Sequence, residues 1–339
     1  MNPSTTMQAA KLEAYGQPFR LATIARPRAE AGQVLVRIAA SGANPLDSKI
    51  RAGAAAHARH PTPAILGLDM AGTVEDLGEG VTRFRRGDEV YGMTGGVGGH
   101  QGSLAQFAAV DADLLALKPA NLSLREAAAV PLVFITAWEG LVDRARLQGG
   151  QTVLVQGGAG GVGSMAIQIT KAFGADVVAT GSPASRALIE RLGAAYADRS
   201  RPTQDLVADL AGGRGFDVVY DTAGGEALDA SFLAVRRFGH VVSCLGWGTH
   251  ALAPLSFKAA TYSGVFTLLP LLTGERRAHH GEILAEATRL IEAGQLTPIL
   301  DPRRFTLATA GEAYRAMEDG ARHGKVVVEI AAGGDAVLD

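Results

Sequence analysis

Residues 153–164 read Val-Leu-Val-Gln-Gly-Gly-Ala-Gly-Gly-Val-Gly-Ser, so a run of strand-forming residues leads directly into a glycine cluster, and a helical pattern follows over residues 164–173. The glycines at 158, 160 and 163 have the spacing G-x-G-x-x-G. One glycine allows a tight turn, the next lets backbone N–H groups approach a pyrophosphate, and the third lets the helix pack on the strand. This strand–turn–helix context predicts a dinucleotide-binding loop formed by Gly158, Gly160, Gly161, Val162 and Gly163.

Beyond residue 150 the sequence alternates between strand-like and helix-like segments. Expected strands cover residues 152–156, 176–180, 216–221 and 240–245, and expected helices cover residues 184–192, 205–210 and 228–236. Strands that are apolar on both faces and separated by helices of this length indicate a parallel sheet covered on both sides. The fold class is therefore α/β, with a doubly wound Rossmann sheet.

The first 120 residues have a different pattern. Strand-like segments at residues 34–39, 70–77, 89–92 and 105–110 are separated by Gly, Pro and Asp, with few helical periods. These features predict a mostly β domain. Residues 324–330 are again strand-like, and we expect them to return to it.

Composition limits the possible partners. The chain has 339 residues and a formal net charge of −2, which gives no electrostatic reason to expect nucleic acid or an anionic membrane. A single cysteine, Cys244, excludes a disulfide framework and a multi-cysteine zinc site. With neither a signal-peptide pattern at its start nor an apolar run long enough to span a membrane, the protein is expected to be cytoplasmic.

Several motifs follow one another in the order found in one enzyme family. They are GANPLD at residues 42–47 with Arg51, LGLDMAG at 66–72, RGDEVYG at 86–92, Pro131 with TAW at 136–138, the glycine loop, DTAGG at 221–225 and GK at 324–325. In these motifs the chain resembles the medium-chain dehydrogenase/reductase superfamily, and within it the zinc-lacking quinone oxidoreductase (zeta-crystallin-like) branch. The resemblance implies a GroES-like catalytic domain over residues 1–125 and 270–339, and a nucleotide-binding domain over residues 126–269. It also implies a homodimer formed partly through residues 255–272.

The residues that correspond to the zinc ligands of the superfamily are replaced. The zinc enzymes carry Cys where this chain has Asn44, and His-Glu where it has Leu68-Asp69. Catalytic zinc needs three protein ligands, and the sequence supplies no such set, so we expect no metal. The histidines at 57, 60, 100, 279 and 280 are expected to face solvent or to line loops.

Candidate catalytic residues come from the resemblance, which places the 44–51 segment at the nicotinamide and substrate cleft. Asn44 is the first choice for a polar group beside the nicotinamide ribose or the substrate oxygen, although an Asn-Pro turn is the alternative. Lys49 stands where related enzymes often have Tyr, so it is either a donor to an oxyanion or a solvated residue. Tyr91 is a loop candidate for substrate contact. Asp47 and Arg51 are expected to form a structural ion pair.

The expected type of cofactor follows from the absence of an acidic residue after the second strand of the Rossmann sheet. An acidic residue about 20 positions beyond the glycine loop would bind the adenosine ribose and favour NAD, but no Asp or Glu lies between residues 176 and 190. Ser182, Ser185 and Arg186 can donate to a 2′-phosphate, and Arg199 adds a second cation. We therefore expect NADP(H). The alternative is that Ser182 caps a helix and Arg186 is solvated.

Further cofactor contacts are expected where strands end at the carboxyl edge of the sheet, at Ala223 and Gly246. By resemblance, Thr136 contacts the nicotinamide side, Phe266 lies in the segment whose backbone holds the carboxamide, and Lys325 reaches the cofactor phosphates.

Three functional hypotheses remain. The first is a zinc-independent, NADPH-dependent reductase of quinones or α,β-unsaturated carbonyls, small molecules that accept hydride without a Lewis acid. The second is a zinc-type alcohol dehydrogenase. The third is a non-catalytic, crystallin-like NADPH-binding protein.

Overall fold

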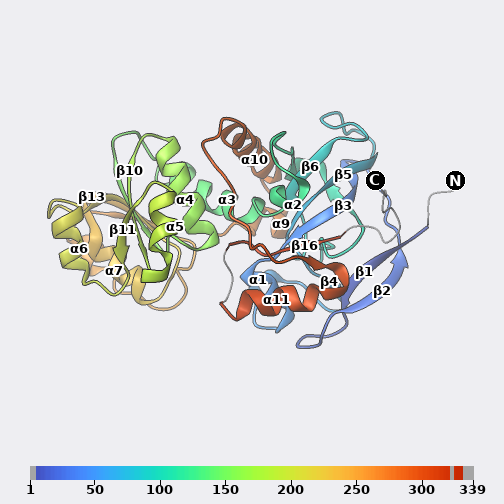
Figure 1. The fold of residues 1–339 in the computed structure, drawn as a ribbon, viewed down its shortest axis with the longest axis horizontal. Helices are drawn as coiled ribbons and strands as arrows, with labels where there is room; N and C mark the ends of the chain where they lie inside the picture. The colour runs from blue at the N-terminus through green and yellow to red at the C-terminus, as the bar shows by residue number, and fades with distance from the viewer. Residues whose placement is uncertain (1–4, 321–323, 331–339) are drawn as a thin grey trace. The chain divides into compact units, whose positions relative to one another are not determined.

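The computed structural model describes residues 5–320 and 324–330 and divides into two compact units (Figure 1). The first unit is formed by Val133–Thr267 with Gly294–Leu296. The second is formed by the described residues of Met1–Leu132, Leu268–Ala293 and Thr297–Asp339. Residues 1–4, 321–323 and 331–339, which belong to the expected catalytic domain, lie outside the described residues.

The first unit is built on a six-stranded sheet in which every strand pair is parallel. The strand order is β11-β10-β9-β12-β13-β14. The strands are β9 (Thr152–Gln156), β10 (Asp176–Gly181), β11 (Ala195–Asp198), β12 (Phe216–Asp221), β13 (Val235–Ser243) and β14 (Thr261–Gly264). The helices are α4 (Gly161–Ala172), α5 (Arg186–Arg191), α6 (Thr203–Leu210), α7 (Glu226–Ala234) and α8 (Ala253–Ser256). This is the doubly wound sheet expected from the alternating pattern, and the expected fold class is confirmed.

The boundary between α7 and β13 differs from the expectation. A helix was expected over residues 228–236, but α7 ends at Ala234 and β13 begins at Val235. Val235 pairs with Phe216 at the start of β12, and the register shifts before Val218 pairs with His240. The pairing with β12 therefore extends the strand into residues whose local pattern suits a helix.

The second unit is mostly strands. One sheet has the order β15-β16-β3-β5-β6-β8, with β7 paired to β3, and a smaller sheet has the order β2-β1-β4. Their bounds are β1 (Thr6–Leu12), β2 (Arg20–Ala25), β3 (Gln33–Gly42), β4 (Ala64–Ile65), β5 (Asp69–Leu77), β6 (Glu89–Met93), β7 (Phe107–Asp111), β8 (Leu115–Leu117), β15 (Phe305–Thr306) and β16 (Val327–Glu329). The helices of this unit include α1 (Pro45–Arg51), α2 (Leu124–Ala127), α9 (Leu269–Thr273), α10 (Arg277–Glu292) and α11 (Ala310–Glu318), while α3 (Pro131–Trp138) spans the boundary between the units.

Helix α10 corrects another expectation. His279 and His280 were expected to face solvent or to line a loop, but α10 begins at Arg277 and His280 is buried. The helix lies close to the chain before β8, since a Cβ atom on Gly281 would stand 2.5 Å from the carbonyl oxygen of Asp113. This tertiary contact buries a segment that is polar in sequence.

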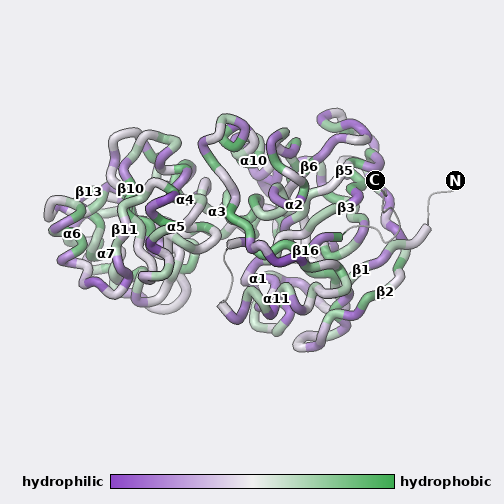
Figure 2. The backbone as a smooth tube through the Cα atoms, viewed as in Figure 1, coloured by the Kyte–Doolittle hydropathy of each residue, from purple (hydrophilic) through white to green (hydrophobic). Residues whose placement is uncertain are grey.

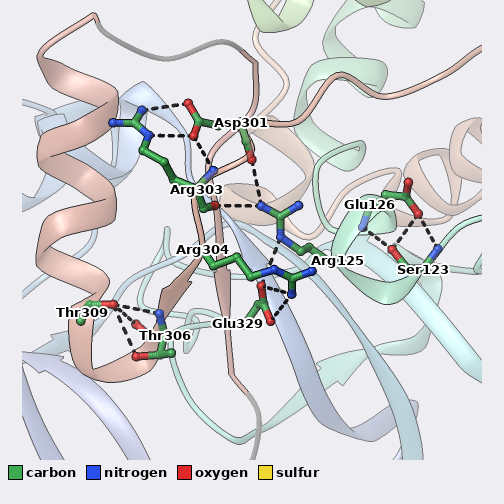
Figure 3. Close-up of polar contacts among 9 residues, drawn as sticks. All are labelled: Ser123, Arg125, Glu126, Asp301, Arg303, Arg304, Thr306, Thr309 and Glu329. Atoms are coloured by element: carbon green, nitrogen blue, oxygen red, sulfur yellow. Dashed lines mark hydrogen bonds and ion pairs between the residues drawn. The ribbon is translucent and has the colours of Figure 1, made fainter.

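Arg125 in α2 contacts the C-terminal part of the second unit, as Figure 3 shows. The guanidinium of Arg125 donates hydrogen bonds of 2.9 Å to the carbonyl oxygens of Asp301 and Arg303, and it lies 3.2 Å from the carboxylate of Glu329 in β16. These contacts tie α2 to the last strand, as expected for a returning tail.

Hydrophobic and hydrophilic stretches both occur along the backbone of each unit (Figure 2), and the central strands of the parallel sheet are buried along almost their whole length. In the parallel sheet, Leu154, Phe216 and Phe232 belong to one cluster of buried apolar residues. No helix of the described residues is long and apolar enough to span a membrane.

Candidate active site

The glycine loop joins β9 to α4 in the geometry that its spacing predicts. A Cβ atom on Gly163 would stand 2.2 Å from the carbonyl oxygen of Gly157, and one on Gly158 would stand 2.6 Å from the Cβ of Ala179. Only glycine fits at these two positions. Helix α4 begins at Gly161, so the N–H groups of its first turn lack partners within the helix and carry the positive end of the helix dipole. The loop is therefore suited to a pyrophosphate.

Hydrogen bonds from neighbouring strands hold this loop in place. The hydroxyl of Thr180 accepts from the N–H of Gly157 at 3.1 Å and donates to the side chain of Gln156 at 2.7 Å. The N–H of Gly158 bonds to the Thr180 carbonyl at 2.9 Å, and Thr222 donates to the Gln156 carbonyl at 2.6 Å. The anion-binding turn is thus fixed by contacts with β10 and β12.

The expected phosphate-binding residues gather after β10. Ser185 donates to the carbonyl of Ser182 at 2.7 Å, and the two hydroxyl oxygens lie 3.4 Å apart. The exposed guanidinium of Arg186 pairs with Glu190 one helical turn further on, at 2.8 Å. It also lies 5.5 Å from the ring centre of Tyr196, within cation–π range. Tyr196 was missed in the sequence because it lies on the next strand, β11.

Asp198 is a second residue of this corner that the sequence analysis missed. It ends β11, where the parallel register sets it beside Gly181. Its carboxylate accepts from the N–H and hydroxyl of Ser200 at 2.9 and 2.6 Å and from Tyr196 at 3.2 Å, and these bonds, those of Ser200 first, lower its pKa. Arg199, exposed, follows directly and donates its N–H to the Gly181 carbonyl. Strand pairing thus adds a carboxylate to the expected serine–arginine group.

A buried polar group lies near the other end of the sheet. The hydroxyls of Thr136 and Thr267 are 3.1 Å apart, and Thr267 donates to the carboxylate of Glu139 at 2.8 Å. Tyr220 from β12 donates to the Thr136 carbonyl at 2.5 Å. Thr136 is therefore held by contacts on both its backbone and its side chain.

The turn after β12 is shaped by Asp221. Its carboxylate accepts from the N–H groups of Ala223 and Gly224 at 3.0 and 2.9 Å, and from the hydroxyl of Ser243 at 2.6 Å. Both Asp221 and Ser243 are buried. These bonds hold Ala223 at the carboxyl edge, where it was expected.

Gly246 and Phe266 follow the ends of β13 and β14. A Cβ atom on Gly246 would stand 2.2 Å from the hydroxyl of Tyr262, so a side chain here would have to move the Tyr262 ring. The ring of Phe266 packs edge-on against Trp247, with ring centres 6.4 Å apart. The two expected residues are thus part of an aromatic edge.

Three polar side chains form a buried cluster in the second unit. The ammonium of Lys325 donates to the Ala43 carbonyl at 3.0 Å and to the side-chain oxygen of Asn44, and it lies 3.6 Å from Asp69. The amide nitrogen of Asn44 donates to Asp69 at 2.9 Å, and the other oxygen of Asp69 accepts from the N–H of Leu132 at 2.9 Å. This cluster connects the starts of α1, β5, α3 and β16.

Asp47 lies next to the cluster and does not pair with Arg51 as expected. Its carboxyl group accepts from the N–H of Asn44 at 2.9 Å, whereas Arg51 pairs with Glu318 at 3.1 Å. Burial raises the pKa of Asp47 to about 8, which favours the protonated form of its side chain at neutral pH. The expected ion pair is wrong, because Asp47 points into the core.

Comparison with known proteins matches both units. Residues 30–120 match the alcohol dehydrogenase GroES-like domain family, and residues 192–328 match the zinc-binding dehydrogenase family. A crystal structure of an alcohol dehydrogenase superfamily protein from Novosphingobium aromaticivorans is 59% identical, with a TM-score of 0.95, and the alignment covers 96% of this chain and 100% of that one. The chain belongs to the medium-chain dehydrogenase/reductase superfamily. Within this superfamily it falls in the quinone oxidoreductase-like branch.

Two plant members of the superfamily are similar over most of the chain. The 2-methylene-furan-3-one reductase of Solanum lycopersicum is 37% identical over 314 residues, which is 90% of this chain and 74% of that protein. The chloroplastic NADPH-dependent alkenal/one oxidoreductase of Arabidopsis thaliana is 35% identical over 309 residues, which is 89% of this chain and 73% of that protein.

The residues at the superfamily's zinc positions do not fit a zinc ion. Asn44 and Leu68 replace its cysteine and histidine, and the carboxylate of Asp69 already has the Lys325 ammonium beside it. A zinc ion bound by Asp69 would have to displace the buried ammonium of Lys325, which also donates a hydrogen bond to Asn44. No group of three or more His, Cys, Asp or Glu side chains that could hold a metal is found in the part of the chain that the structure describes.

One of the histidines is not where the sequence placed it. His280 is buried within α10, although a solvent or loop position was expected, whereas His60 lies in a loop and is buried there. Burial lowers the pKa of His60, which favours its neutral form. These histidines are core residues of the second unit.

The three expected catalytic residues lie in different surroundings. Asn44 is buried and its amide is occupied within the cluster. Tyr91 is in β6, the strand expected at residues 89–92, where it is fully buried and donates to the Leu284 carbonyl of α10 at 2.7 Å, so it is not an accessible contact for substrate. Burial raises its pKa further from neutrality. Lys49 is exposed on α1. We therefore do not carry Tyr91 into the proposed site.

Proposed function

We propose that this chain is an NADPH-dependent reductase that transfers hydride to an α,β-unsaturated carbonyl compound, with quinones as a second substrate class. The observation that carries the proposal is the glycine loop at the start of α4, held by Thr180 and Thr222. Two relatives of the chain are named as a 2-methylene-furan-3-one reductase and an NADPH-dependent alkenal/one oxidoreductase. We also propose that the two compact units are the catalytic and nucleotide-binding domains of this enzyme.

The residues after β10 would hold the adenosine end of the cofactor. Ser182, Ser185 and Arg186 can each donate to a 2′-phosphate, and the charge of Arg186 is available once it exchanges Glu190 for the phosphate. The carboxylate of Asp198 opposes a phosphate, but its bonds to Ser200 occupy one of its oxygens. Three donors to a 2′-phosphate against one partly occupied carboxylate favour NADPH over NADH.

When bound, the cofactor supplies the hydride. The protein would bind the pyrophosphate at the first turn of α4 and orient the nicotinamide end near Thr136 and the turn after β12. We keep Asn44 and Lys49 as candidate contacts of the reacting end, and Lys325 as the cation that orients Asn44. Zinc takes no part in the proposed reaction, because the Asn44–Asp69–Lys325 cluster is built around an ammonium ion.

The edge strand β14 supports the proposal of a homodimer. It is the outermost strand of the parallel sheet, and Tyr262 on it is partly exposed. An exposed strand edge can pair with a second copy, and a twofold axis would close such a pair. Sedimentation equilibrium at low micromolar concentration tests this, and a monomer would exclude it. The cytoplasmic location stays a prediction.

The deciding experiment combines cofactor titration with turnover. Calorimetric titration of the purified protein should show tighter binding of NADPH than of NADH, and methyl vinyl ketone should then drive NADPH oxidation. Activity that a chelator abolishes and zinc restores would establish the zinc-type dehydrogenase instead. Binding of NADPH without turnover of any enone or quinone would support the non-catalytic alternative, and preference for NADH would overturn the assignment of Ser182, Ser185 and Arg186 to a 2′-phosphate.

A further inference from the structure

Two aromatic side chains stand exposed at the carboxyl edge of the parallel sheet. Trp247 follows the end of β13 and is 56% exposed, and Phe266 follows the end of β14 and is 36% exposed. Their rings meet edge-on at 88°, with centres 6.4 Å apart. We call these two residues the aromatic pair.

The loop that carries Trp247 is anchored. The ring of His250 lies 3.2 Å from the Trp247 carbonyl oxygen and 2.8 Å from the carboxylate of Asp229 on α7. The same ring packs edge-on against Phe232, a core residue, with centres 6.2 Å apart. Trp247 is therefore presented by a loop fixed to α7 and to the core.

The position of the aromatic pair connects it with the proposed chemistry. Ligands of open α/β sheets bind at the carboxyl ends of the strands. The segment that holds Phe266 continues into Thr267, which bonds to Thr136 and Glu139. The strands that carry the aromatic pair, β13 and β14, stand at the opposite end of the strand order from β10, which leads to Ser182 and Arg186.

We propose that Trp247 and Phe266 bind the flat apolar substituent of the substrate, so that this enzyme prefers aryl-conjugated enones to small ones. This inference rests on the proposed reductase function. An aryl group packed against the pair gains burial and ring–ring contact, whereas a methyl group gains little of either. The pair determines specificity and takes no part in hydride transfer.

A selectivity measurement tests the proposal. We compare kcat/KM for benzylideneacetone and methyl vinyl ketone in the wild type, Trp247→Ala and Trp247→Phe. The matched control is Phe257→Ala, because Phe257 is 86% exposed in the same unit but precedes the start of β14. Trp247→Ala should lower the ratio of benzylideneacetone to methyl vinyl ketone by about tenfold, mostly through KM. Trp247→Phe should restore part of it, and the control should leave it unchanged.

The other outcomes overturn the proposal in distinct ways. An unchanged ratio in Trp247→Ala excludes the aryl contact. Equal loss with both enones assigns Trp247 to general positioning, and a change of mass in solution assigns it to contact with a second copy. If the wild type reduces neither enone, the proposed function fails. Calorimetric binding of benzylideneacetone to wild type and Trp247→Ala then decides the inference alone, and equal affinity overturns it.

Discussion

The ammonium of Lys325 lies 3.6 Å from the carboxylate of Asp69, and both side chains are buried. Breaking a buried pair leaves an uncompensated charge in the core. Lys325→Met should therefore lower the free energy of unfolding by about 3–5 kcal/mol, measured by urea titration. The control is Lys11→Met, which removes a partly exposed pair with Glu13 and should cost less than about 1 kcal/mol. Equal losses in the two variants would contradict a buried ion pair.

Asp47 should make stability depend on pH. Its pKa is raised to about 8 by burial, from 3.8, so the folded protein binds one proton more than the unfolded chain between these values. Stability from this group is complete below pH 4, falls as pH rises and levels off above pH 8. From pH 6 to pH 8 the wild type should lose on the order of 2 kcal/mol more than Asp47→Asn, which keeps an acceptor for the Asn44 N–H.

The comparison of wild type with Asp47→Asn controls for the neighbouring titratable groups, because the substitution leaves them unchanged. The titratable groups that act on the carboxyl of Asp47 include Asp69, Lys325 and Tyr314. Because they are present in both proteins, their own pH dependence largely cancels in the difference. Parallel stability curves for wild type and Asp47→Asn over this range would show that Asp47 is ionised in the fold.

Gly163 should not tolerate a side chain. The new methyl group of Gly163→Ala would stand 2.2 Å from the Gly157 carbonyl oxygen, so the turn must shift. We expect a loss of about 1–3 kcal/mol in stability together with weaker NADPH binding. Gly311→Ala in α11 is the control, because the nearest atom is 3.7 Å away and alanine favours helix. It should stabilise the protein slightly. A Gly163→Ala variant with unchanged stability and affinity would show that the turn is loosely packed.

Arg186 should discriminate between the two cofactors. Arg186→Ala removes a cation from the proposed phosphate site, so the Kd for NADPH should rise about 10- to 100-fold while the Kd for NADH changes little. Arg191→Ala, at the far end of α5, is the matched control and should leave both unchanged. Equal weakening of both cofactors in Arg186→Ala would rule out contact with the 2′-phosphate.

Local sequence patterns predicted the structure best where contacts between near neighbours in the chain determine the conformation. The strand–turn–helix around Gly158 and Gly163 depends on residues within one turn, and it folds as expected. The α7–β13 boundary did not follow its local pattern, because the pairing of Val235 with Phe216 comes from a distant strand. The helical start at Arg277 has the same explanation, since the contacts of α10 with the sheet bury His280.

The candidate site divides in the same way. The motifs indicated Ser182, Ser185 and Arg186 from their order in the chain, but Asp198 reaches that corner only because β11 pairs with β10 in parallel register. Tyr91 lies in the strand expected at residues 89–92, but it was also a candidate for substrate contact, and its burial in the core argues against that role. No local signal distinguishes a tyrosine at a surface from one that bonds to the Leu284 carbonyl.

By itself the sequence determined the α/β class, the glycine loop and the replacement of the zinc ligands, since each depends on residue type and short-range spacing. Only the tertiary structure decided which charges are buried together. Asn44 lies 25 residues from Asp69 and 281 residues from Lys325 along the chain. The three side chains meet because the starts of α1, β5 and β16 lie close together in the fold. Burial and pairing arise from contacts between distant segments, so the protonation of Asp47 and the exposure of Trp247 could be known only from the fold.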